Sequence, residues 1–268
     1  MIRFIHLTDL HLSHPDAGDP GDRSGNAQTL RQVITAINAM ETQPAFVVAS
    51  GDLTNLGDTA SYHLLRDHLA PLKAPLLMAL GNHDKRAGFY ETWGHDATEE
   101  PYFHQSLQGG LHVITLDTSR AGHVAGTICA PQFALLERAL EQHKETPKII
   151  VMHHPPRIDA DGLPWGSIDM ASTERLAATL KGHDIAAILS GHIHINRVSH
   201  WHGIPIIVSI GLNSSVDLLE TVDMRLIEGR GFGICDWRPS GMSVSFAPLT
   251  PAPQELGTID RARLLAFT

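Results

Sequence analysis

Short apolar runs recur along the chain, and five of them lead directly into polar residues. Such runs, bounded by turn residues, are typical of buried strands. We call the residues that directly follow each of these five strands a polar exit. In order, the exits are Asp9 and His11 after 2–7, Gly51 and Asp52 after 45–49, Gly81 to Asp84 after 75–80, His153 after 149–152, and Gly191, His192 and His194 after 185–189. In open α/β sheets, ligand sites lie beyond the carboxyl ends of the strands, so the five exits predict one shared site.

Between these strands, apolar residues recur at the spacing of amphipathic helices. We expect helices over 26–40, over 58–69 behind a cap at Asp58 or Thr59, over 132–143 behind Pro131, and over 172–180 with Ser172 as the cap. Further strands are expected at 111–116, 204–208, 231–237 and 243–246, whereas 91–108 is irregular and predicts loops with a short strand. Strands alternate with helices up to about residue 190, which indicates a layered α/β fold with a partly parallel sheet.

Composition narrows the class of protein. The chain has 268 residues, of which 43% are hydrophobic and 18% charged, as is ordinary for a soluble globular protein. The net charge of −9 argues against broad nucleic-acid binding, which requires clustered Lys and Arg. Cys129 and Cys235 form no CxxC pair, so we expect no disulfide framework and a reducing compartment. No apolar run approaches the ~20 residues of a membrane span, and the expected location is the cytoplasm.

The polar exits hold residues that bind metals. Residues i and i+2 of an extended chain point to the same face, so Asp9-x-His11 and His192-x-His194 can each supply two ligands to one place. Asp52 adds a carboxylate, Asn82 a carbonyl oxygen and His153 an imidazole. Oxygen and nitrogen donors without a thiolate suit Mn, Fe, Zn or similar ions.

Seven candidate ligands are too many for one tetrahedral site. If one carboxylate bridges, they divide into two sets of four, which is the two-metal arrangement used for in-line displacement at phosphorus, with ions ~3.5–4 Å apart. Taken singly, Asp9, Asp52 and Asn82 are also ordinary turn or cap residues, and His11 and His153 could be solvated imidazoles. Their occurrence at five successive strand ends favours a shared site.

Taken in order, the motifs Asp9-x-His11, Gly51-Asp52, Gly81-Asn82-His83-Asp84, His153-x-Pro155 and Gly191-His192-x-His194 resemble the five motifs of the calcineurin-like metallophosphoesterases. The resemblance implies a single domain over 1–268, a four-layer αββα sandwich of two mixed β-sheets flanked by helices. Residues 212–268 would supply C-terminal strands, a candidate cap loop and a tail. It also implies two metal sets: Asp9, His11, Asp52 and His194 for one ion, and Asp52, Asn82, His153 and His192 for the other, with Asp52 as the bridge.

Within that superfamily the chain is most similar to the bacterial class III cyclic nucleotide phosphodiesterases and related glycerophosphodiesterases. The stretches 81–84, 117–122 and 152–156 carry this likeness. Protein Ser/Thr phosphatases differ, because their second motif continues into an acidic and arginine pair and their third ends in Glu. Here Leu53-Thr54-Asn55 follows Asp52, and the third motif ends in Asp84.

The implied function is hydrolysis of a small phosphodiester, with a 3′,5′- or 2′,3′-cyclic nucleotide as the leading substrate. A glycerophosphodiester or phosphomonoester hydrolase is the alternative, and the charge balance disfavours a nuclease. The fold also serves as a non-catalytic interaction scaffold, in which the metal ligands are typically incomplete. All seven are present here, which argues against that role. The expected cofactors are two metal ions, Fe or Mn, with Zn or Co as alternatives. The resemblance also implies a homodimer or larger assembly, and no membrane partner is expected.

A mechanism follows from this assignment. A metal-held hydroxide attacks phosphorus in line with the leaving oxygen. His83 is not assigned to a metal, so it is free to protonate that oxygen or to stabilise the transition state, and Asp84 either orients His83 or caps a helix. Candidate substrate contacts besides His83 are His154, Arg120 and Asn213, although a surface ion pair is the favoured role of Arg120.

Overall fold

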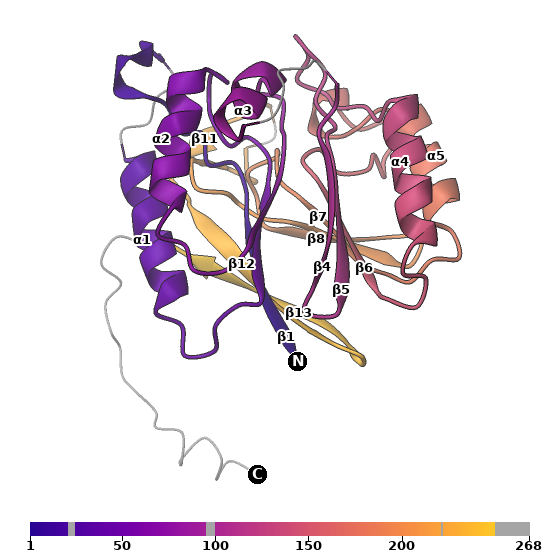
Figure 1. Ribbon diagram of the computed structural model, residues 1–268. Helices are drawn as coiled ribbons and strands as arrows, with labels where there is room; N and C mark the ends of the chain where they lie inside the picture. Colours follow the sequence, from indigo (N-terminus) through magenta and orange to yellow (C-terminus); the bar gives the residue numbers. More distant parts are fainter. Residues whose placement is uncertain (21–24, 95–99, 221, 250–268) are drawn as a thin grey trace.

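The computed structural model describes residues 1–20, 25–94, 100–220 and 222–249, and in this part of the chain two β-sheets face each other between two layers of helices (Figure 1). The first sheet has the order β13 (Gly241–Pro248), β12 (Gly231–Arg238), β1 (Ile2–Leu7), β2 (Phe46–Ser50) and β3 (Leu76–Ala79). The second has the order β4 (Phe103–Gln108), β5 (Leu111–Leu116), β6 (Lys148–Met152), β7 (Ile185–Ser190), β9 (Ile204–Val208) and β8 (Arg197–Trp201). The predicted αββα sandwich is confirmed.

Both sheets are mixed, and their parallel strands carry the polar exits. β1, β2 and β3 are parallel in the first sheet, where β12 and β13 add antiparallel strands. β5, β6, β7 and β9 are parallel in the second sheet, with β4 and β8 as antiparallel edges. Because parallel strands end at the same edge, the ends of β1, β2, β3, β6 and β7 open toward one place.

Helices cover the outer face of each sheet. α1 (Asn26–Asn38) and α2 (Thr59–Leu69) pack on the first sheet, and α4 (Ala130–Glu141) and α5 (Met170–Leu180) pack on the second (Figure 1). Each helix buries an apolar stripe, such as Val33 and Ile37 of α1. A third apolar layer fills the space between the sheets, where the rings of Phe4 and Phe46 stack with centroids 4.8 Å apart.

One predicted helix cap is confirmed and one is wrong. The Asp58 carboxylate accepts a hydrogen bond from the Ser61 backbone N–H at 2.9 Å and caps α2. α5, however, is capped by Asp169, whose carboxylate accepts from the Ser172 N–H at 2.7 Å. Ser172 lies inside the first turn, and its hydroxyl donates to the same carboxylate.

The segment predicted as irregular, 91–108, contains the expected strand, β4, and just before it the structure has a helix that was not predicted, α3 (Arg86–Thr92), whose last two residues enter the segment. α3 is short and has a glycine inside it, so its sequence carries no periodic signal. Aromatic packing stabilises it instead, since the Phe89 ring lies 4.8 to 5.9 Å from the rings of Trp93, Tyr102 and Tyr62. A side chain at Gly88 would meet the Gly57 carbonyl oxygen at 2.9 Å, which explains the glycine.

The structure adds smaller elements that the sequence pattern does not predict. These are β8, β10 (Ser215–Val216), β11 (Leu226–Ile227) and two 3-10 turns, η1 (Pro15–Ala17) and η2 (Pro164–Gly166). β10 and β11 pair within the segment predicted as a candidate cap loop. The predicted tail at 250–268 lies outside the described residues. Within the described part of the chain, no helix has the length and apolar character needed to span a membrane.

An ion pair ties the C-terminal strands to the first strand. Arg3 of β1 and Asp236 of β12 are cross-strand partners, and the guanidinium donates two hydrogen bonds to the carboxylate at 2.8 and 2.9 Å. Arg3 holds the pKa of Asp236 below its ordinary value through these bonds. The pair therefore adds stability above the pKa of an unfolded Asp, about 4, and loses it as the pH falls through the lower pKa of the folded state.

We expect Asp236→Asn to lower the free energy of unfolding by about 1 kcal/mol at pH 7, because a bidentate, partly buried pair is lost. In urea unfolding, the difference from the unaltered protein is expected to shrink below about pH 4. The control is Asp67→Asn, because the Asp67 carboxylate is largely exposed beside Arg66. Equal losses in the two variants would contradict the assigned role.

Candidate metal centre

Three predicted ligands from the first and fifth strand exits lie together. The ligand atoms of Asp9, His11 and His194 are all within 4.8 Å of one another. His194 Nε2 lies 3.2 Å from both Asp9 Oδ1 and His11 Nε2. Asp9 is completely buried and His11 nearly so. The carboxyl ends of β1 and β7 thus bring two imidazoles and a carboxylate together, with Asp9 and His11 buried and His194 partly exposed.

The second, third and fourth exits reach the same place. His153 Nε2 lies 3.1 Å from Asp52 Oδ2, and the rings of His153 and His192 have centroids 5.1 Å apart. Asp52 Oδ2 also lies 3.6 Å from His11 Nε2, so this carboxylate stands between the two groups of side chains. Asn82 Oδ1 is buried without a hydrogen-bond partner among the described residues.

Hydrogen bonds fix which nitrogen of each ring faces the cluster. His153 Nδ1 bonds to the Ser50 carbonyl at 2.9 Å, and His194 Nδ1 to the Ser214 carbonyl at 3.0 Å. Carbonyls only accept, so both Nδ1 atoms carry a proton, and Nε2 is the ring nitrogen that faces the cluster in each case. His192 is reversed: its Nε2 donates to the Trp165 carbonyl at 2.6 Å, which leaves Nδ1 with the lone pair.

His11 is oriented by a side-chain relay. Asn55 Nδ2 donates to Asp19 at 2.6 Å, so the oxygen of this amide is the atom that faces His11 Nδ1 at 2.8 Å. His11 must therefore donate from Nδ1, and its Nε2 also faces the cluster as an acceptor. Asn55 additionally accepts, through its backbone carbonyl, a hydrogen bond from His83 Nδ1 at 2.9 Å.

The centre thus gathers two carboxylates and the inward ring nitrogens of histidines in overlapping groups, and the partnerless amide oxygen of Asn82 belongs to the loop whose Gly81 and His83 border Asp52. Buried carboxylates and imidazole nitrogens at these distances favour positive charge between them. Burial alone would lower the pKa of His153, but the carboxylate of Asp52 outweighs it and raises that pKa to about 9. Burial would raise the pKa of Asp9, but His194 and His11 hold it well below its usual value. The residues fit a pair of metal cations.

The backbone is strained where these side chains leave it. Positive φ angles are found at Asp9 (49°), His11 (44°), Asp52 (49°), His192 (73°) and His194 (50°). The left-handed region costs non-glycine residues of order 1–3 kcal/mol each, and such strain clusters at functional sites. The sequence pattern predicts that each Asp-x-His or His-x-His pair converges because the chain is extended there, and that explanation is wrong. The side chains converge because both members of each pair adopt the left-handed conformation.

Glycines allow the strand ends to approach this closely. A side chain at Gly81 would clash with the Asp52 carboxylate and the His153 ring, and one at Gly191 would clash with Thr8 and Asp9. Gly51 combines a φ of 106° with contact to the His153 ring. The glycine of each motif is thus required by the side chains that surround it.

A family model described as calcineurin-like phosphoesterase matches residues 2–196, which include all seven candidate ligands. The chain belongs to the calcineurin-like phosphoesterase family. The match ends shortly after β7, so β8, β9 and the C-terminal strands lie beyond it.

Relatives of this phosphoesterase support the same family. A probable cyclic nucleotide phosphodiesterase of Rhodococcus erythropolis is 33% identical over 219 residues, covering 80% of this chain and 72% of the relative. A cAMP/cGMP dual specificity phosphodiesterase of Mycobacterium tuberculosis is 32% identical over 224 residues, covering 80% and 68%. The crystal structure of a dimetal phosphatase from Danio rerio aligns with a TM-score of 0.69 at 15% identity, covering 92% and 96%, which shows the shared fold.

Asp84 of the phosphoesterase neither caps α3, whose N-cap is Lys85, nor has a described hydrogen bond to His83. Its carboxylate accepts hydrogen bonds from the backbone N–H groups of Gly81, Leu53 and Thr54 at 2.9 to 3.1 Å and from the Tyr62 hydroxyl at 2.9 Å. Asp84 therefore binds the loop after β3 to the loop after β2, which holds Asp52 and Asn82 in place.

His83 lies at the edge of the cluster and is partly exposed. Its backbone N–H donates to Asp52 Oδ1 at 2.9 Å, and its ring meets the His11 ring edge-on with centroids 4.7 Å apart. Since Nδ1 is engaged with the Asn55 carbonyl, the free ring atom is Nε2. This position, beside the converging ligands but open to solvent, suits contact with a substrate.

The remaining predicted substrate contacts are placed less favourably. His154 is completely buried, and its two ring nitrogens bond to the Thr118 hydroxyl at 2.7 Å and the Val124 carbonyl at 3.0 Å. Neither nitrogen is left for a substrate in this arrangement. Arg120 is exposed on a turn, and Asn213 accepts a hydrogen bond from Asn26 at 3.2 Å. Substrate roles for these three residues stay predictions.

Sequence reasoning missed the residues that orient the ligands. Asn55, Asp19 and Trp165 act on His11 and His192 from loops, two of them through an amide relay and one through a backbone carbonyl. Asn55 lies three residues after Asp52, and this closeness to a motif is the one sequence signal that could have identified it. A backbone carbonyl leaves no sequence signal.

We expect Asn55→Ala to weaken metal affinity about 10- to 100-fold, because His11 loses the acceptor that fixes its tautomer and orientation. Metal titration followed by elemental analysis would measure this. The matched control is Asn38→Ala, which removes a hydrogen-bonded amide between α1 and the turn before β3. Unchanged metal affinity in Asn55→Ala would refute the relay, whereas equal weakening in both variants would point to general destabilisation.

Proposed function

We propose that this phosphoesterase hydrolyses a cyclic nucleotide, 3′,5′ or 2′,3′, at a centre that binds two metal ions. The single observation that carries the proposal is the convergence of two groups of side chains on the Asp52 carboxylate, whose Oδ2 lies 3.6 Å from His11 Nε2 and 3.1 Å from His153 Nε2. The printed names of the two bacterial relatives, which describe cyclic nucleotide phosphodiesterases, support this substrate class.

The proposed ligand sets share Asp52 as a bridge. One ion would be held by Asp9, His11, Asp52 and His194, and the other by Asp52, Asn82, His153 and His192. When bound, such ions neutralise the charge of the phosphate and activate water for attack at phosphorus. Nitrogen and oxygen ligands without a thiolate favour iron or manganese, with zinc and cobalt as accepted replacements.

His83 is proposed to protonate the leaving oxygen. Its Nε2 is open, and its backbone N–H and Nδ1 anchor it to Asp52 and Asn55, so the ring is held beside the bound phosphate. A general acid in this position contributes about 10²- to 10⁴-fold to turnover. Asp84 has an indirect part, because it fixes the loop from which Asn82 and His83 project.

His83→Ala is expected to lower kcat on a cyclic nucleotide by about 100-fold or more while metal content stays near that of the unaltered protein. Steady-state kinetics together with elemental analysis would separate the two effects. His63→Ala on the exposed side of α2 is the control. An unchanged turnover number would remove His83 from the mechanism, and a parallel loss of metal would make it a ligand instead.

The substrate class is tested with metal-reconstituted protein on four kinds of substrate. These are 3′,5′- and 2′,3′-cyclic nucleotides, a glycerophosphodiester, bis(p-nitrophenyl) phosphate and p-nitrophenyl phosphate. The proposal expects the highest kcat/KM on a cyclic nucleotide and a smaller value on the monoester. Preference for the glycerophosphodiester or the monoester would replace the proposed substrate. Inactivity on all four after metal loading would leave only a binding role.

A further inference from the structure

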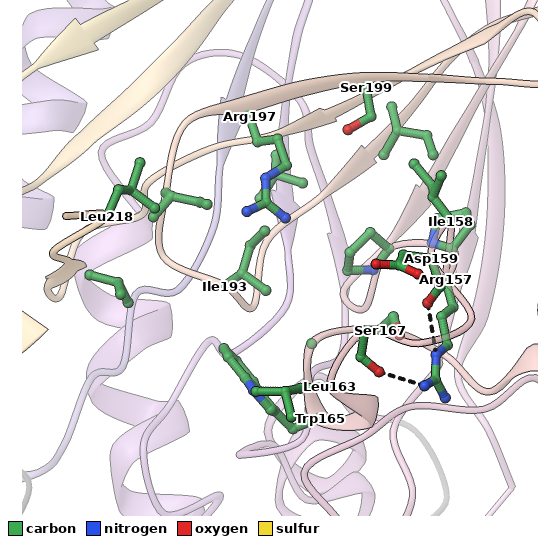
Figure 2. A pocket seen from close by; sticks show the side chains of 18 residues that line it. Arg157, Ile158, Asp159, Leu163, Trp165, Ser167, Ile193, Arg197, Ser199 and Leu218 are labelled. Atoms are coloured by element: carbon green, nitrogen blue, oxygen red, sulfur yellow. Dashed lines mark hydrogen bonds between the residues drawn. The ribbon is translucent and has the colours of Figure 1, made fainter. Parts of the chain in front are cut away.

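A groove of about 590 Å³ opens on the outer side of the second sheet, against β8 and β9 (Figure 2). Its floor comes from β8 and β9, and its walls come from the loop after β6 and the turn after β7. Residues from each wall include Pro156, Trp165, Ile193, Arg197, Ser199 and Val208. The volume lies within the range of small-molecule sites, which is about 300–1,000 Å³.

The lining has the composition of a ligand site. Ile193, Ile206 and Val208 provide a buried apolar floor, whereas Leu163 at 75% exposure and Leu218 at 64% form an apolar rim. Large apolar side chains gathered at a concave surface mark interaction sites more often than chance exposure does. Few polar groups face the groove, so those that do would set the orientation of a ligand.

The two arginines of the groove differ in their bonds. Arg157 donates hydrogen bonds to the backbone carbonyls of its own loop, at Asp159, Ala160 and Gly162, and so braces the wall. The guanidinium of Arg197, the first residue of β8, has no hydrogen bond or ion pair with any residue in the described ranges, and Figure 2 shows this side chain reaching toward Ile193. Its guanidinium therefore remains available to a ligand in the groove.

The groove shares a wall with the candidate metal centre. Trp165, which lines the groove, accepts the hydrogen bond from His192 Nε2 at 2.6 Å, and its ring lies 5.5 Å from the His192 ring. Ile193, another lining residue, stands between His192 and His194 in the sequence. A molecule whose phosphate lies at the metal centre could therefore place its other end across Trp165 and into the groove.

We propose that the groove holds the nucleobase of the cyclic nucleotide and that Arg197 recognises the acceptor edge of that base. The inference rests on the function proposed above. An apolar trough beside an aromatic ring suits a flat heterocycle, and a planar guanidinium can donate two parallel hydrogen bonds. Guanine offers two acceptors on one edge, O6 and N7, whereas adenine offers N7 beside an amino donor. Arg197 therefore favours cyclic GMP over cyclic AMP.

The test compares kcat/KM on cyclic GMP, cyclic AMP and bis(p-nitrophenyl) phosphate, which has no nucleobase. Arg197→Ala is expected to lower the ratio of cyclic GMP to base-free hydrolysis about 5- to 150-fold, with a smaller change for cyclic AMP. The effect is expected mainly in KM, since Arg197 does not contact the reacting phosphate. Arg197→Lys keeps the charge but loses the paired donors, so the preference for guanine should fall there too.

Two further variants make the result specific. Ser199→Phe fills the groove from the same face of β8 and is expected to raise KM for both cyclic nucleotides. Arg138→Ala removes an exposed positive charge from α4 and is expected to change none of the ratios. Urea unfolding of each variant would show that the fold is kept.

The outcomes separate the two proposals. If the unaltered protein hydrolyses cyclic nucleotides and Arg197→Ala leaves the ratio of cyclic GMP to base-free hydrolysis unchanged, the groove assignment is overturned and the proposed function stands. If the unaltered protein cleaves bis(p-nitrophenyl) phosphate but no cyclic nucleotide, the proposed function fails and the groove assignment fails with it. A selective loss on cyclic GMP supports both.

Discussion

Electrostatic repulsion among buried acceptors is the constraint on which the rest of this structure depends. Asp9, Asp52 and ring nitrogens of His11, His153 and His194 form overlapping groups whose ligand atoms lie within 4.8 Å of one another, and all of these residues except His194 are buried. In a medium of low dielectric such an arrangement is costly unless positive charge resides within it. The fold therefore has to hold the loops in place against their tendency to separate, and metal ions turn this repulsion into attraction.

Several local features serve that purpose. Asp84 binds the loops after β2 and β3 to each other through backbone N–H groups, and motif glycines let the strand ends pack without clashes. Backbone carbonyls from distant segments hold the outer nitrogens of His153 and His194. The site is thus positioned by both sheets together, and side chains from one sheet alone would complete neither of the proposed ligand sets.

The strands and the order of the polar exits could be predicted because both depend on local sequence. Each of the five strands before an exit appears where the apolar pattern placed it, and the layered fold followed from the alternation. Features that depend on remote contacts escaped prediction. α3 is stabilised by Tyr62 and Tyr102 rather than by its own periodicity, and β8 is an edge strand with mostly exposed side chains. The orientations of His153, His192 and His194 depend on backbone carbonyl groups, which every residue has, so no sequence pattern distinguishes them.

The left-handed backbone at Asp9, His11, Asp52, His192 and His194 has a consequence for transplantation of the site. A short peptide that carried one of these motifs would relax to the ordinary helical or extended regions and turn its side chains apart. Grafting the motifs onto an unrelated scaffold would transfer the residue types but not the backbone conformation that brings their side chains together. To transfer this site to another protein, one would consequently have to transfer both facing sheets and their connecting loops, which is nearly the whole sandwich.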